Sequence, residues 1–171
     1  NRSRGHCPIL VMSPEPKAMQ PMNGASDGAK IGPLASLQQL QDVDGFVTRA
    51  KAAGATVAAG GEKLKMDTGG YFYTPTILSN VTRDMEVARD EVFGPVLSVI
   101  AYDNVDEALS VANDVAFGLS SCLYSERTDV VERFVAESES GMIHVNAGSF
   151  PENHLPFVGV KDSGMGVGGS N

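Results

Sequence analysis

Apolar residues recur with helical spacing in the stretch that follows Ser36. They return every three or four residues, so they would share one face of a helix. The set consists of Leu37, Leu40, Val43, Val47, Ala50 and Ala53. Ser36 is suited to cap the start of this helix and Gly54 to end it. The pattern therefore predicts an amphipathic helix between these two residues.

Short apolar runs alternate with turn signals after this helix. Residues 55–61 (ATVAAGG) and 69–81 (GGYFYTPTILSNV) predict short strands bounded by glycine turns. Residues 94–102 (GPVLSVIAY) form a near-continuous apolar run, which is typical of a strand covered on both faces. Residues 103–115 (DNVDEALSVANDV) predict a helix with an acidic first turn.

The alternation of strand and helix continues toward the C-terminus. Residues 118–125 (GLSSCLYS) and 141–146 (GMIHVN) predict two further strands. Between them, Asp129 and Glu132 have the spacing of a capping box. The apolar face of that helix would consist of Val130, Val131, Phe134 and Val135. This order predicts an α/β domain with a mainly parallel open sheet, flanking helices and right-handed crossovers.

The segments before and after these predicted strands and helices differ from them in composition. Residues 13–33 carry four of the nine prolines and few apolar residues, so they resemble a linker. We accordingly divide the chain into an N-terminal segment and Pro/Gly-rich linker at 1–30 and a domain at 31–171. After Asn146 the chain is rich in Gly, Ser and Pro, which predicts a long loop at the C-terminal end of a strand. Ligands of open α/β sheets gather at such strand ends.

Composition and charge narrow the class of protein. The chain has 171 residues and a formal net charge of -8, and it contains no run of basic residues. We therefore expect no nucleic-acid partner. No apolar run reaches the length of a membrane span. The two cysteines do not suggest a disulfide framework, which favours a reducing compartment and a cytoplasmic protein. Because the chain opens on Asn rather than Met, we expect a fragment or a trimmed chain.

The cysteines and histidines do not by themselves indicate a catalytic thiol or a metal site. A catalytic thiol needs a cation, a helix N-terminus or a nearby base, and His6 beside Cys7 would point to the opposite face of a strand. The residues alone therefore favour an ordinary thiol at Cys7. Cys122 lies in the middle of a predicted strand, and we expect it to be buried. The three histidines show no metal-ligand spacing, so no metal site is predicted.

The stretch EVFGPV at 91–96 carries a carboxylate and an aromatic ring just before an apolar strand. In one interpretation, Glu91 is an ordinary exposed carboxylate. In the other, Gly94 and Pro95 fix a tight turn that holds Glu91 and Phe93 at the sheet edge. Glu91 would then accept hydrogen bonds from ribose hydroxyls, and Phe93 would pack on a flat heterocycle. Spacing alone does not favour the second interpretation over the first.

Several segments in order resemble the aldehyde dehydrogenase superfamily. EVFGPV resembles its glutamate-phenylalanine-Gly-Pro signature, and HLPFVGVKDSGMG at 154–166 resembles its Pro-Phe-Gly-Gly-x-Lys-x-Ser-Gly loop. Further segments agree with the family's catalytic domain. They are IGPLAS at 31–36, AGATVAAGG at 53–61, GGYFYTPTILSNV at 69–81, GLSSCLYS at 118–125 and GMIHVN at 141–146. The resemblance runs from about Ile31 to Gly166.

The resemblance implies the oxidation of a small aldehyde to a carboxylic acid with NAD or NADP as cofactor. In this family a cysteine thiolate attacks the aldehyde to form a thiohemiacetal, amides stabilise the oxyanion, hydride passes to nicotinamide, and water releases the acid. By position, Cys7 would be the nucleophile, Glu91 would hold the nicotinamide ribose, and Phe93 would pack near the nicotinamide ring. Phe157 would help to line the substrate entrance.

The sequence also departs from the family pattern. Gly5-His6-Cys7 only partly resembles the Gly-Gln-x-Cys setting of the nucleophile, so Cys7 is either that nucleophile in a shortened frame or an unrelated residue. Val158 replaces the first of two loop glycines, and we expect the cofactor-binding domain of the family to be absent. We therefore expect a truncated catalytic domain that is inactive alone and that needs a missing partner domain or a homo-oligomer. The alternative is a non-enzymatic interaction or self-assembly module derived from that domain.

Overall fold

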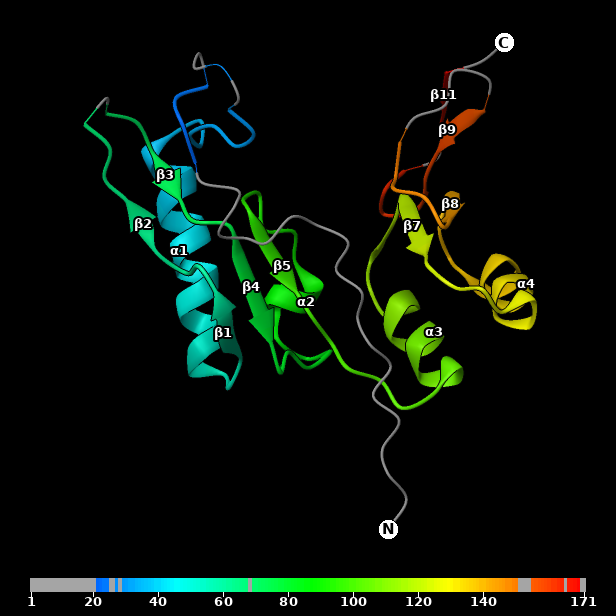
Figure 1. The fold of residues 1–171 in the computed structure, drawn as a ribbon. Coiled ribbons are helices and arrows are strands. Elements are labelled where there is room, and N and C mark those ends of the chain that lie inside the picture. The colour runs from blue at the N-terminus through cyan, green and yellow to red at the C-terminus, as the bar shows by residue number, and fades with distance from the viewer. Residues whose placement is uncertain are drawn as a thin grey trace. The chain divides into compact units, whose positions relative to one another are not determined.

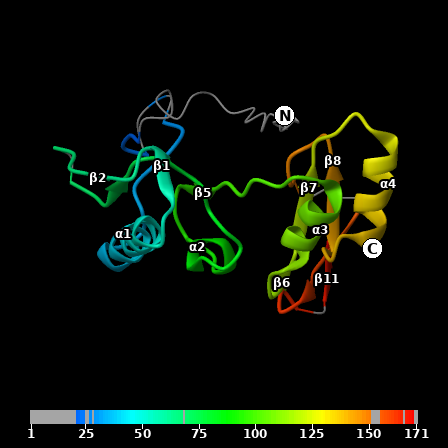
Figure 2. The same cartoon turned by 90° about the horizontal axis from the view of Figure 1, so that it is seen from below.

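The structure is a computed structural model that describes residues 21–24, 27, 29–67, 69–150, 155–164 and 166–169. It divides into two compact units, residues 1–99 and 100–171. Figures 1 and 2 show the elements of each unit in two views. The predicted division at residue 30 is a different boundary and stays a prediction.

The first unit is built on one long helix and short strands. Its elements are α1 (Leu37–Ala52), β1 (Thr56–Ala59), β2 (Lys63–Leu64), β3 (Phe72–Tyr73), β4 (Thr76–Ser79), α2 (Glu86–Arg89) and β5 (Val96–Ser98). β4 lies between β1, which is antiparallel to it, and β5, which is parallel to it. β2 and β3 form a separate antiparallel pair. Buried residues come from α1, β3, β4 and α2, so the core of this unit involves its helices and its sheets.

The helix predicted after Ser36 is confirmed. The Ser36 hydroxyl accepts a hydrogen bond from the backbone N–H of Gln39 at 3.1 Å, as a capping residue should. The Gln39 side chain in turn accepts from the N–H of Ala35 at 2.8 Å. Gly54 follows the helix with φ of +107°, a conformation that costs glycine little. Leu40, Val43, Val47 and Ala50 form the buried stripe.

The second unit combines two helices with short strand pairs. Its elements are α3 (Val105–Asn113), β6 (Phe117–Gly118), β7 (Ser120–Leu123), α4 (Thr128–Glu137), β8 (Met142–Val145), β9 (Pro156–Val158), β10 (Val160–Lys161) and β11 (Val167–Gly169). β7 and β8 are parallel, while β6 pairs with β10 and β9 pairs with β11 in antiparallel fashion. α3 contacts α4, and α3 begins where the Asn104 side chain accepts from the N–H of Glu107.

The α/β class is confirmed, but the sheets are small and mixed rather than mainly parallel. Among the described residues, two strand pairings are parallel and four are antiparallel. The glycine pairs at 60–61 and 69–70 have positive φ values between +69° and +101°. These turns reverse the chain, so β2 and β3 pair antiparallel without a helical crossover.

Three burial or capping predictions are wrong. The run 94–102 forms only the three-residue β5, and Leu97 is 49% exposed, so one face of this strand is open in the described part of the chain. Cys122 is exposed, since burial alternates along β7 and Cys122 lies on its open face. α4 begins after Arg127 without a side-chain cap, because Asp129 bonds the Arg127 guanidinium instead.

The prediction of a structureless loop after Asn146 is also wrong in part. The strands β9, β10 and β11 lie in that segment, although each has only two or three residues. Their signal in the sequence is weak because glycines interrupt the apolar residues and no alternation lasts beyond three positions. β10 pairs with β6, which ties this segment to residues 117–118.

Candidate functional site

The predicted cofactor residues lie on a tight turn in the first unit, just before β5. The Gly94 N–H bonds the Val92 carbonyl at 2.5 Å, and the Val96 N–H bonds the Gly94 carbonyl at 2.8 Å. The Pro95 carbonyl accepts from the N–H of Thr76 at the start of β4. These bonds hold the turn against the edge of the β1–β4–β5 sheet.

Helix α1 fixes the other side of this turn. The Gln39 side-chain amide donates to the Phe93 carbonyl at 2.5 Å. A Cβ at Gly94 would lie only 2.5 Å from Cγ2 of Val43, closer than real Cβ contacts come. Glycine is therefore required by the packing of the turn on the helix. The Gly-Pro pair thus has a structural explanation that does not involve a ligand.

Glu91 and Phe93 themselves are left facing solvent. Glu91 is exposed, and the Phe93 side chain is 68% exposed although its backbone is anchored. An exposed phenylalanine on an anchored turn offers an apolar surface at a fixed position, and the carboxylate two residues earlier offers hydrogen-bond acceptors. The two residue types suit a ribose and a flat ring, as half of a dinucleotide site would require.

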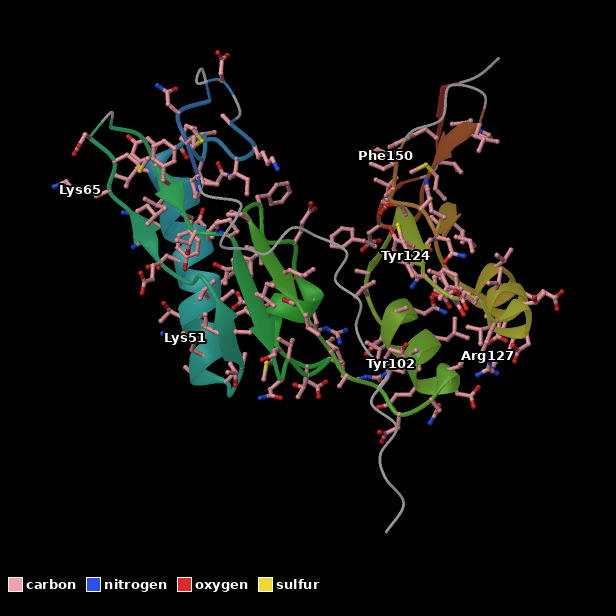
Figure 3. All side chains as sticks on the ribbon, in the orientation of Figure 1. Lys51, Lys65, Tyr102, Tyr124, Arg127 and Phe150 are labelled. Carbon is pink, nitrogen blue, oxygen red and sulfur yellow. The ribbon has the colours of Figure 1, made fainter. Side chains whose placement is uncertain are left out.

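The second unit contains a cavity of about 290 Å³ beside β8. β8 residues form one part of its wall, and Phe150 together with residues 155–158 forms the other part. The principal lining residues are Met142, Ile143, His144, Phe150, Leu155 and Phe157. Phe150, labelled in Figure 3, is 69% exposed, and Phe157 is 42% exposed, so the cavity opens to solvent. The predicted substrate residue Phe157 therefore lines an apolar cavity.

Lys161 anchors β10, the strand that follows the one carrying Phe157. Its ammonium donates to the carbonyls of Asn113 at 2.7 Å and Val115 at 3.1 Å, and it forms an ion pair with Glu139 at 2.5 Å. The residue has a positive φ of +53°, a conformation that non-glycine residues rarely adopt. Its three contacts offset this backbone cost and join the end of α3 to β10.

Charged side chains elsewhere form surface ion pairs. Hydrogen bonds from Arg133 lower the pKa of the Glu137 carboxyl, and Glu137 and Asp106 together raise the pKa of Arg133. Burial, with Asp44 nearby, raises the pKa of the Tyr73 hydroxyl in the core of the first unit. These groups support α4 and the first core, and none of them lines the cavity beside β8.

The remaining candidates have different outcomes. Cys7, His6 and His154 lie outside the described residues, so the nucleophile stays a prediction. Glu91 and Phe93 share one turn in the first unit, whereas Phe157 belongs to the second unit. Sequence reasoning missed His144 and Phe150 as cavity residues. A histidine within the otherwise apolar run at 141–145 was the available signal for the first.

The described residues contain neither a membrane-crossing helix nor a metal-binding cluster. No helix there is both long and apolar enough for a bilayer. Likewise, no group of three His, Cys, Asp or Glu side chains in the described ranges is placed to hold an ion.

Comparisons with known proteins give a consistent result. The model of the "Aldehyde dehydrogenase family" matches residues 12–171, a range that begins after Cys7. Succinate-semialdehyde dehydrogenase, mitochondrial, of Rattus norvegicus is 41% identical over 154 residues, covering 90% of this chain and 29% of its own length.

Solved structures agree with that match. 3,6-Anhydro-L-galactose dehydrogenase in complex with NAP is 34% identical, with a TM-score of 0.86, covering 90% of this chain and 32% of its own. Betaine aldehyde dehydrogenase from Staphylococcus aureus in complex with NAD+ is 30% identical, with a TM-score of 0.84. The match covers 89% of this chain and 31% of the betaine aldehyde dehydrogenase chain. The chain therefore spans about three tenths of the length of the relatives that it matches.

Proposed function

The chain belongs to the aldehyde dehydrogenase family, and from that premise we propose that it forms part of an NAD(P)-dependent enzyme that oxidises an aldehyde to an acid. The observation that carries the proposal is the family match over residues 12–171, supported by a TM-score of 0.86 to a solved dehydrogenase. We take residues 31–171 as the partial catalytic domain. The chain spans about three tenths of its relatives' length, and without the rest of a cofactor site it would lose binding energy, so we expect no activity from the chain alone.

Each candidate residue has a role in this proposal. Glu91 would accept hydrogen bonds from the nicotinamide ribose, and Phe93 would pack beside the nicotinamide ring. NAD(P), when bound, supplies the hydride acceptor. Phe157 would line the entrance for the aldehyde. The exposure of Glu91 and Phe93 on an anchored turn supports these roles, because a ligand-binding surface must be both accessible and fixed.

Cys7 is the proposed nucleophile. A nucleophilic thiol is activated by a lowered pKa, so we expect Cys7 to be alkylated as a thiolate well below the free-cysteine pKa of about 8.5. Peptide mass spectrometry after alkylation over a range of pH resolves Cys7 from Cys122. Reaction of Cys7 only above that pKa would remove it from the proposed mechanism.

A chimera tests the proposed function directly. Residues 12–171 would replace the matching segment of the rat succinate-semialdehyde dehydrogenase, to which this chain is 41% identical. We expect the chimera to form NADH from NAD and succinate semialdehyde, while the isolated chain does not. A folded chimera without any NADH formation would contradict the proposal.

A specific observation favours a second function, a self-assembly module. The second unit exposes several large apolar side chains. They include Tyr124 at 63%, Val135 at 51%, Phe150 at 69% and Val167 at 70%. Such surface can drive association with a second copy of the chain. Sedimentation over a wide concentration range should then show a dimer, and a strictly monomeric species would exclude self-assembly.

We retain the cytoplasm as the proposed compartment. The support is cysteine usage, since two cysteines provide no disulfide framework. The rat relative carries the word mitochondrial in its name. Fractionation of cells that produce the full-length protein would decide between these compartments.

A further inference from the structure

The loop that precedes α1 carries the one Asn-Gly pair of the sequence, Asn23-Gly24. Asn23 and Gly24 are both exposed, although Pro21 just before them is buried. The Met22 N–H donates to the Ile31 carbonyl at 2.9 Å, so the pair lies at the start of a loop that this hydrogen bond closes. The loop therefore presents an asparagine amide to water, directly beside a glycine.

Gly24 allows its backbone nitrogen to approach the side chain of Asn23. A Cβ at Gly24 would have no heavy atom within 4 Å, and the backbone of Gly24 does not adopt a positive φ. Glycine reaches more combinations of φ and ψ than any other residue. No side chain at position 24 obstructs the five-membered ring that forms when this nitrogen meets Cγ of Asn23.

The exposure of Asn23 leaves its side chain able to rotate into this reaction. Water can replace the hydrogen bonds of an exposed amide at a small net change in free energy. The Asn23 amide can therefore turn toward the Gly24 nitrogen without disturbing the buried part of the first unit.

The other described asparagines differ from Asn23 in both respects. The Asn80 amide donates to a threonine hydroxyl at 3.0 Å, and the Asn104 side chain accepts from a backbone N–H at 2.9 Å. Asn113 and Asn146 each accept from a backbone N–H and donate to a backbone carbonyl. The residues that follow these four all carry a side chain, namely Val81, Val105, Asp114 and Ala147. These asparagines provide internal standards within the same chain.

We propose that Asn23 is a site of spontaneous deamidation. The Gly24 nitrogen gives up its proton and attacks Cγ of Asn23. A C–N bond forms, and the side-chain nitrogen leaves as ammonia with that proton. Water then opens the cyclic imide at either of its carbonyls, which gives aspartate or isoaspartate. The net reaction consumes one water and releases one ammonia, so it needs no oxidant, reductant or enzyme, and it is independent of the proposed function.

The reaction changes both the charge and the length of the loop. Either product replaces a neutral amide by a carboxylate, which adds one negative charge to a chain whose formal net charge is -8. Isoaspartate also directs the main chain through the side-chain carbonyl. The backbone is then one atom longer inside the loop that the hydrogen bond between Met22 and Ile31 closes.

Peptide mass spectrometry of the full chain provides the test. After incubation at mildly alkaline pH, trypsin would cleave behind Lys17 and Lys30, and fragments of residues 18–30 report the exchange of NH2 for OH at Asn23. Isomerisation of Asp27 before Gly28 leaves the mass unchanged and does not interfere. A sample digested without incubation corrects for deamidation during digestion.

The internal standards set the expected rate. Deamidation at Asn23 should be at least about tenfold faster than at Asn80 or Asn146, a factor that a barrier difference of about 1.4 kcal/mol produces. A synthetic peptide of residues 18–30 gives the rate without the fold. We expect the folded chain to react at a rate within about tenfold of this peptide, since the loop leaves the pair exposed.

Two glycine variants separate the role of Gly24 from a general change in the loop. Gly24→Ala should slow deamidation at Asn23 roughly tenfold, and the open space at Gly24 predicts that this variant folds. Gly32→Ala is the matched control. It adds the same methyl group to a glycine of the same segment that does not follow an asparagine, so it should leave the rate unchanged.

Three results would overturn the inference. The first is a folded chain that reacts more than about tenfold more slowly than the peptide, because the loop would then protect Asn23. The second is an equal rate at Asn23, Asn80 and Asn146. The third is a rate at Asn23 that Gly24→Ala leaves unchanged.

Discussion

The two units differ in how much apolar surface they bury. Among the described residues, the first unit contains eleven of the twelve buried hydrophobic residues, and the second unit contains only Leu109. The exposed large hydrophobic residues show the opposite distribution, with five in the first unit and ten in the second. The first unit thus has its own core of buried side chains. The two helices and the short strands of the second unit leave most of their apolar side chains at least partly exposed to solvent.

The contrast is clearest in the helices. α1 buries Leu40, Val43, Val47 and Ala50, whereas α4 has no buried residue despite its amphipathic sequence. Most helical stability in proteins comes from packing an amphipathic face. α4 therefore has an apolar face whose cover is incomplete. An amphipathic pattern therefore predicts a helix without predicting its burial.

Core truncation in the first unit should have the largest effect. Leu78 of β4 is fully buried, so Leu78→Ala should lower the free energy of unfolding by about 2–5 kcal/mol. The matched change Val135→Ala in α4 should cost less than about 0.5 kcal/mol, since this residue is 51% exposed. Urea unfolding followed by circular dichroism measures both. Equal losses would mean that the second unit has a core comparable to the first.

The second-largest effect concerns Lys161, whose ammonium contacts hold β10 in the second unit. Lys161→Met removes the three contacts of the ammonium and leaves two carbonyls without their donor. We expect faster amide exchange in β6 and β10 and a stability loss of about 1–3 kcal/mol. Lys161→Arg keeps the positive charge, so its loss of stability should be smaller. If the Met variant exchanges like the unmodified chain, apolar contacts rather than Lys161 hold these strands together.

The smallest effect is a pH-dependent one in the first unit. Arg49 and Glu86 join α1 to α2 through two hydrogen bonds, and these lower the pKa of Glu86 below its ordinary value of 4.5. The pair therefore stabilises the fold above that value, and the stabilisation is lost as the pH falls through the lower folded-state pKa. Glu86→Gln should be slightly less stable than the unmodified chain at neutral pH and equal to it in strong acid.

The control for this pH dependence is another exposed glutamate. Glu132→Gln in α4 changes the same functional group in the second unit. Thermal unfolding at a series of pH values compares the two variants. A difference for Glu86→Gln that stays constant down to strong acid would contradict the assignment to the ion pair.

The sequence predicted local structure better than it predicted burial. Ser36, Gly54 and the spacing between them are enough to specify α1, because capping and periodicity act over a few residues. The exposure of Cys122 and Leu97 could not be predicted in this way. It depends on whether another strand or helix covers the same face, and that is decided by distant parts of the chain.

The candidate site was predictable to different extents. Glu91 and Phe93 were identified through a resemblance, and the structure adds the reason for the glycine beside them, its contact distance to Val43. His144 and Phe150 were not predicted as a cavity. They meet where the Phe150 carbonyl lies 3.3 Å from Nε2 of His144, and no short-range pattern encodes such a contact.

The turn before β5 allows the most direct test of the account. In the chimera, Glu91→Gln should raise the KM for NAD about ten- to hundredfold, as expected for the loss of hydrogen bonds to a charged acceptor. Asp90→Asn, an adjacent exposed acid, should leave the KM unchanged. A selective effect of Glu91 would support a cofactor surface on this turn. Equal KM values for both variants and the unmodified chimera would contradict it.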